Sequence, residues 1–108
     1  MDGEQFLYVL RATRLGMLTE GPTAEEAAVL QRHVAYLSAL ASEGRVLLFG
    51  RTQTHDADTR GIVIFRAPDE AAARALVDAD PAVAGGVMLA ELYPYKVAGY
   101  CDPRAFGL

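Results

Sequence analysis

The chain has 108 residues, of which 52% are hydrophobic, and a formal net charge of −4. This length is typical of one domain with its own packed core, and the apolar content excludes a disordered chain. The acidic balance argues against a sequence-independent nucleic-acid binder, because the ten basic residues are spread along the chain without forming a stripe. We interpret residues 1–108 as a single domain, with its core at about 5–97 and a tail at about 98–108.

Compartment signals are few. The chain contains no run of about 18 apolar residues, and its N-terminus lacks a signal-peptide pattern, so we expect no membrane partner. The single cysteine, Cys101, excludes an internal disulfide and is typical of a reducing compartment. We therefore expect a small cytoplasmic protein in which Cys101 is a bystander thiol of the tail.

Apolar runs and turn signals predict the elements in chain order. A strand at residues 6–10 is followed by a loop at 15–22. A long helix then starts at Thr23, which forms a capping-box pattern with Glu26, and stops at Gly44. Strands at 46–50 and 61–66 flank a polar loop at 52–60. A second helix covers 71–77 after an acidic start at Asp69, a helical turn covers 80–86, and a last strand covers 87–93.

This order, βαββαβ, predicts an α+β, ferredoxin-like fold with a four-stranded antiparallel sheet. In such a fold both helices cover one face of the sheet, so the other face should be polar if it meets water. Here the strands are apolar on both parities, as Ile62 and Ile64 against Val63 and Phe65 illustrate. We expect a homodimer whose sheets meet face to face in a dimeric α+β barrel, with a heterodimer or a fused partner as alternatives.

His33 is the first candidate for chemistry, because it falls within the apolar stripe of the long helix. At 100° per residue that stripe contains Ala27, Leu30, Val34, Leu37, Leu40 and Ala41. A buried imidazole needs a hydrogen-bond partner and titrates near neutrality, which suits a general acid or base. The alternative is a core histidine whose partner is a backbone carbonyl, and the helical pattern alone slightly favours it.

Asp80 offers a carboxylate that can orient such an imidazole. An Asp followed by Pro81 is also a typical helix start, in which the carboxylate caps the first turn. The two roles are compatible, because one oxygen can cap the turn while the other accepts the His33 N–H. Asp78 is a competitor on the preceding helix end.

The remaining candidates are weaker. Arg11 and Arg51 end strands and are candidates to bind an anionic substrate group, although strand-end arginines are more often solvated. Tyr8 and Tyr36 are candidates to line a pocket for an aromatic ligand, with packing as the default. We expect no metal site, because His55 in the polar loop lacks a second histidine or cysteine at ligand spacing.

The chain resembles the YCII-related (YciI-like) family of the dimeric α+β barrel superfamily. The segment at 79–87, ADPAVAGGV, is similar to the family's ADPYVAAGVY signature, although Ala82 replaces the tyrosine. His33-Val34 followed by Leu37 also matches, and Gly50 fits an AGP-like element in which Arg51 stands where proline is frequent. The resemblance implies a His–Asp site at His33 and Asp80. It also implies relatives that are mostly uncharacterised, one branch resembling a cofactor-free elimination enzyme for chlorinated hydroxyquinols.

Two functional hypotheses from different classes follow. The first is a cofactor-independent enzyme that performs elimination or isomerisation on a small, phenolic type of molecule. The second is a non-catalytic module that binds a small molecule on the same scaffold, and it is supported by the scarcity of other catalytic groups. A haem-binding or oxygen-using relative of the superfamily is a third and weaker reading, and we expect no cofactor.

Overall fold

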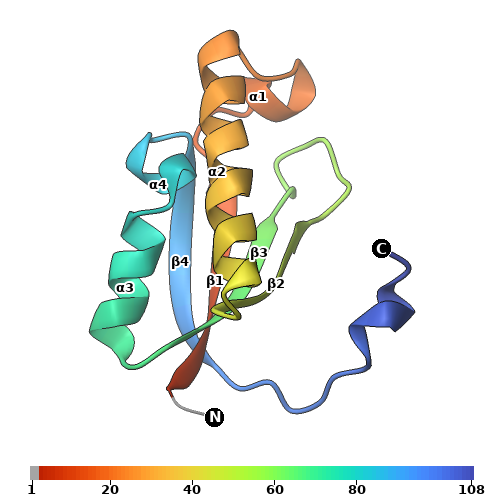
Figure 1. Cartoon of the computed structure of the whole chain (residues 1–108). Helices are drawn as coiled ribbons and strands as arrows, with labels where there is room; N and C mark the ends of the chain where they lie inside the picture. The colour runs from red at the N-terminus through yellow and green to blue at the C-terminus, as the bar shows by residue number, and fades with distance from the viewer. Residues whose placement is uncertain (1–2) are drawn as a thin grey trace.

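The computed structural model describes residues 3–108 as four antiparallel strands covered on one face by helices (Figure 1). The strand order is β2-β3-β1-β4. The strands are β1 (Glu4–Ala12), β2 (Val46–Arg51), β3 (Gly61–Ala67) and β4 (Met88–Tyr95). The helices are α1 (Gly16–Thr19), α2 (Ala24–Ser42), α3 (Glu70–Asp78) and α4 (Pro81–Ala84), with a 3-10 turn η1 (Pro103–Phe106) in the tail. The predicted ferredoxin-like α+β fold is confirmed.

The core lies between the sheet and the helices. Along β1 the side chains of Phe6, Tyr8 and Leu10 are buried, whereas Leu7 and Val9 are only partly covered. This alternation follows from the period of two in a strand, which sends successive side chains to opposite faces. Leu37 of α2 and other apolar helix residues complete the same cluster. Burial of these side chains is the main force that holds the helices on the sheet.

Helix α2 begins and ends as its sequence predicts. The Thr23 hydroxyl accepts a hydrogen bond from the Glu26 N–H at 3.1 Å, and the Glu26 carboxylate accepts one from the Thr23 N–H at 2.8 Å. Gly44 follows the helix with φ +74°, a left-handed conformation that glycine adopts without a steric cost. Both ends of the helix are therefore set by local sequence.

The buried stripe of α2 is narrower than predicted. Leu37 and Leu40 are buried, but Val34 is 51% exposed and Ala41 is exposed. The prediction was wrong for these two positions, because the helix contacts the sheet along a line and the flank with Val34 faces a cavity instead. The loop prediction for 15–22 also missed α1, a single helical turn.

The face of the sheet without helices is apolar across all four strands. The register places Leu48, Ile64, Leu7 and Tyr93 in one row of paired positions. Leu48 and Tyr93 are 43% and 44% exposed, respectively. A water-facing sheet would carry polar side chains at such positions.

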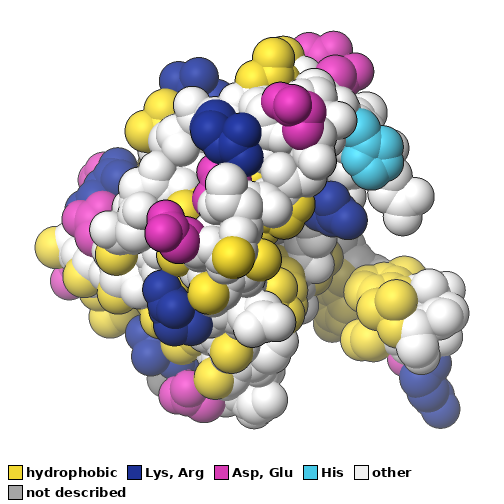
Figure 2. Space-filling view, turned by 90° about the horizontal axis from the view of Figure 1, so that it is seen from above, with side chains coloured by type: hydrophobic (Ala, Val, Ile, Leu, Met, Phe, Trp, Pro, Cys, Tyr) yellow, Lys and Arg dark blue, Asp and Glu magenta, His cyan; other side chains and the backbone are white. Residues whose placement is uncertain are grey.

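The tail leaves the sheet after β4 and extends away from the body of the molecule (Figure 1). From above it forms a separate lobe that carries hydrophobic surface (Figure 2). Tyr100 in this tail is 93% exposed, and Phe106 is 47% exposed. The tail thus adds little to the core, as the sequence predicted.

Candidate active site

The structure brings His33 and Asp80 into direct contact. His33 lies near the middle of α2, and Asp80 is the residue that precedes α4, 47 positions further along the chain. The His33 Nδ1 atom lies 2.7 Å from Asp80 Oδ1. The His33 side chain is 12% exposed and the Asp80 side chain is completely buried. This is the only contact between a histidine and a carboxylate within the described residues.

Asp80 is held where α3 gives way to α4. Its backbone is extended, with φ −61° and ψ 123°, and its Oδ1 atom accepts a hydrogen bond from the Ala82 N–H at 2.9 Å. Pro81 stands at the first helical position, where its missing N–H costs nothing. The sequence reading placed the cap and the histidine on different oxygens, whereas the structure places both on Oδ1.

The second oxygen of Asp80 is occupied by Tyr8. The Tyr8 hydroxyl donates to Asp80 Oδ2 at 2.8 Å from the middle of β1. Burial, followed by the nearby Asp80 carboxylate, raises the pKa of Tyr8 far above its ordinary value, so this hydroxyl keeps its proton. Three donors therefore surround a buried carboxylate, an arrangement that suits its ionised form.

This arrangement assigns the tautomer of His33. An ionised carboxylate only accepts hydrogen bonds, so Nδ1 is the atom that carries the proton in the contact with Asp80. A neutral imidazole then has Nε2 as its acceptor. Because His33 lines a cavity, Nε2 is the ring nitrogen available to a bound molecule.

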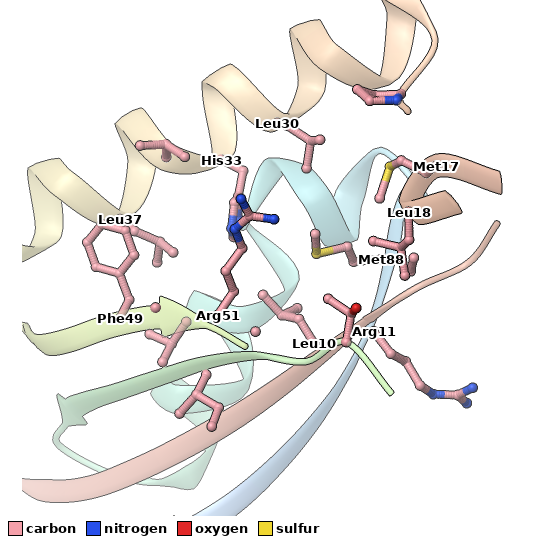
Figure 3. A pocket seen from close by; sticks show the side chains of 18 residues that line it. Leu10, Arg11, Met17, Leu18, Leu30, His33, Leu37, Phe49, Arg51 and Met88 are labelled. Carbon is pink, nitrogen blue, oxygen red and sulfur yellow. The ribbon is translucent and has the colours of Figure 1, made fainter. Parts of the chain in front are cut away.

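The cavity lies between α2, α1 and the sheet (Figure 3) and has a volume of about 560 Å³. This volume is within the range of small-molecule sites, which are concave and mostly apolar with a few polar groups. Its wall is formed mainly by apolar side chains, including Leu10, Met17, Leu18, Leu30, Leu37, Phe49 and Met88. Its polar members are His33, Arg11, Arg51 and Thr59. The cavity can hold a small apolar molecule against the imidazole.

The two tyrosine candidates do not line this cavity. Tyr8 is fully buried behind Asp80, and the Tyr36 hydroxyl donates to the Leu76 carbonyl of α3 at 2.6 Å. Tyr8 has the parity of the core residues of β1, which directs it under the helices rather than into the open space. The expectation of direct ligand contacts by these two side chains is therefore not met. The role of Tyr8 as a partner of Asp80 was missed, and no local sequence signal announces a contact between residues 72 positions apart.

The other candidates are dispersed. Arg11 and Arg51 both line the cavity. Asp78 is exposed at the end of α3, and Cys101 is exposed in the tail. Residues 3–108 contain no group of three or more His, Cys, Asp and Glu that could hold a metal ion. None of the helices in this part of the chain is both long and apolar enough to cross a membrane.

The fold and the site define a ferredoxin-like α+β protein with a ligand-sized cavity beside a buried His–Asp pair. The chain belongs to the YCII-related domain family, whose model matches residues 8–96. No curated protein matches the sequence significantly.

Two solved structures share the fold. One is 5-chloro-2-hydroxyhydroquinone dehydrochlorinase from Burkholderia phenoliruptrix AC1100 in complex with 2,5-dihydroxybenzoquinone, with a TM-score of 0.61 and 20% identity. That match covers 84% of this chain and 93% of the other. The other is SnoaB, a cofactor-independent oxygenase from Streptomyces nogalater, with a TM-score of 0.46 and 15% identity over 93% of this chain and 97% of that one.

Proposed function

We propose that the protein is a cofactor-independent enzyme that uses His33 and Asp80 for acid–base chemistry on a small, phenolic type of molecule. The observation that carries this proposal is the 2.7 Å contact between a buried carboxylate and an imidazole that lines a cavity. A fold shared with a dehydrochlorinase that was solved with a dihydroxybenzoquinone supports a substrate of this kind.

The chemistry begins with proton transfer to His33. Nε2 of the neutral imidazole takes a proton from a hydroxyl or an acidic carbon of the bound molecule. The ionised Asp80 stabilises the resulting imidazolium through Nδ1 and keeps the ring in place. In an elimination, the electron pair left on the substrate expels a leaving group such as chloride, and the net loss is HX. In an isomerisation, the imidazolium returns the proton to another atom of the same molecule.

The test uses 5-chloro-2-hydroxyhydroquinone and a panel of related phenols, with chloride release and hydrogen–deuterium exchange into the substrate as readouts. General acid–base catalysis typically contributes about 10²–10⁴-fold to a rate. We expect His33→Gln to lower turnover by that factor. His55→Gln is the matched control, because His55 is the only other histidine and lies in the exposed loop between β2 and β3.

The alternative is a binding or regulatory module. The same panel separates it from the enzyme: a phenol that binds the parent protein without exchange or chloride release favours the module. Turnover that survives His33→Gln unchanged contradicts the acid–base assignment.

We also propose that the functional unit is a homodimer formed through the open face of the sheet. The apolar row of Leu7, Leu48, Ile64 and Tyr93 supports this assembly, because an exposed apolar surface of this kind is typical of an interface. A second copy would cover it with an identical surface, as a two-fold interface requires.

A further inference from the structure

We propose that Arg51 is a specificity-determining residue that makes the cavity select a small apolar molecule with a carboxylate group. This inference rests on the proposed function, because it names the class of molecule that would lie against His33. It is carried by the register of β2, the charges of the cavity wall and the space around the guanidinium group.

The register puts Arg51 on the same side of the sheet as His33. Phe49 pairs with the buried Val63, and Arg51, two positions further on, pairs with Gly61. Gly61 pairs in turn with the buried Leu10 of β1. Because paired residues share a face, Arg51 belongs to the face that the helices cover. Figure 3 shows its side chain directed from β2 toward α2, where His33 lies.

Arg11 differs from Arg51 in this respect, although it also lines the cavity. It follows Leu7 and Val9 in the alternation of β1 and pairs with Leu89, which is 48% exposed. Its parity is therefore that of the open face. In Figure 3 the side chain of Arg11 points away from the centre of the cavity. Arg11 thus provides a matched control at the same cavity.

The charges of the wall are all of one sign. The described lining residues include two arginines and a histidine but neither Asp nor Glu. Within residues 3–108, Arg51 takes part in no hydrogen bond or ion pair with the protein, whereas Arg14 and Arg104 are bound by the carboxylates of Glu26 and Asp102. The whole chain carries a net charge of −4, so this cationic wall is a local feature. An anionic ligand would supply the missing partner.

The space around Arg51 suits a planar anion on an apolar body. Gly61, its partner in the pairing, has no side chain to fill the neighbouring position. Apolar residues such as Phe49, Leu37 and Met88 form the rest of the wall. The planar guanidinium fork matches the two oxygens of a carboxylate, which makes that group the best geometric fit.

Binding of benzoate and of benzamide to the full-length protein tests this proposal, because the two molecules have nearly the same shape and differ in charge. Isothermal titration at about pH 8 keeps an ordinary histidine mostly neutral. We expect benzoate to bind the parent protein about tenfold more tightly than benzamide, the effect of one hydrogen-bonded charge. Arg51→Gln should abolish this preference without changing the affinity for benzamide. Arg51→Lys should retain part of it.

Two controls make the outcome decisive. Arg11→Gln should leave the preference for benzoate within about twofold, since exposed charges at this distance contribute little. His33→Gln should keep the preference while losing turnover, so loss of the acid–base function and loss of the anion site are separate results. Equal affinity of the parent protein for benzoate and benzamide, or a preference that survives Arg51→Gln, overturns the proposal. An equal loss on Arg11→Gln also overturns it, because the effect would then be a general field and not a site.

Discussion

At the scale of single residues, Asp80 organises the candidate site because three groups from different elements converge on its carboxylate. Tyr8 comes from the central strand β1, His33 from α2 and the Ala82 N–H from α4. A buried carboxylate is costly unless it is fully hydrogen-bonded, so each donor contributes to stability as well as to geometry.

The Tyr8 hydroxyl is therefore expected to matter for folding. Tyr8→Phe removes one of the donors to a buried charge, and we expect the free energy of unfolding to fall by about 1–3 kcal/mol. Urea denaturation measures it. Tyr36→Phe is the matched control, because its hydroxyl donates to the neutral Leu76 carbonyl, and its loss should be about 1 kcal/mol. Equal losses for the two variants would contradict the special role of Asp80 as an acceptor.

Asp80→Asn separates structure from chemistry. Its amide oxygen can still cap α4, so we expect a folded protein. The neutral amide no longer stabilises an imidazolium, so turnover on any substrate found should fall by about a hundredfold or more. Circular dichroism checks the fold and chloride release or deuterium exchange checks the rate. Undiminished turnover in a folded Asp80→Asn protein would remove Asp80 from the mechanism.

At the scale of elements, the start of α2 is joined to the segment that covers the cavity. Arg14 lies just before α1 and donates through Nε to Glu26 Oε2 at 3.0 Å, and a second contact joins its Nη2 to Oε1. The hydrogen bond from Arg14, followed by the backbone hydrogen bond from Thr23, lowers the pKa of Glu26 from 4.5 to about 2. The capping box thus also anchors the loop that carries Met17 and Leu18 to the cavity.

This carboxylate predicts a specific pH dependence. A pKa that is lower in the folded state stabilises the protein above the unfolded value, and this contribution is lost as the pH falls from 4.5 to about 2. We expect Glu26→Gln to lower the melting temperature at neutral pH and to flatten its decline in that window. Glu25→Gln, at the exposed neighbouring position, should leave the decline unchanged. Thermal melts followed by circular dichroism across this pH range provide the measurement.

At the scale of the whole molecule, the open face of the sheet determines assembly. Ile64→Lys places a charge in the centre of the apolar row, where a second copy would bury it. We expect the parent protein to sediment as a dimer at about 10–100 μM and the variant as a monomer. Ala75→Lys on the exposed side of α3 is the control and should remain dimeric. A monomeric parent protein in sedimentation velocity contradicts the proposed homodimer.

Much of the fold was predictable because its signals are local. The alternation in β1, the Thr23–Glu26 capping box and the Asp80-Pro81 helix start each depend on residues close together in the sequence. The candidate site was less predictable. Helical periodicity alone favoured a core histidine at position 33, and the pairing with Asp80 came from the resemblance to the YCII-related family.

The sequence by itself determined the order of the elements, the ends of α2 and the apolar character of both sheet faces, because backbone preference and side-chain period act over a few residues. Only the tertiary structure decided that Tyr8 holds Asp80, that Val34 faces a cavity and that Arg51 and Arg11 differ in direction. These features depend on how β1, α2 and the start of α4 are stacked. Contacts between residues 47 and 72 positions apart follow from that packing, and no local pattern encodes them.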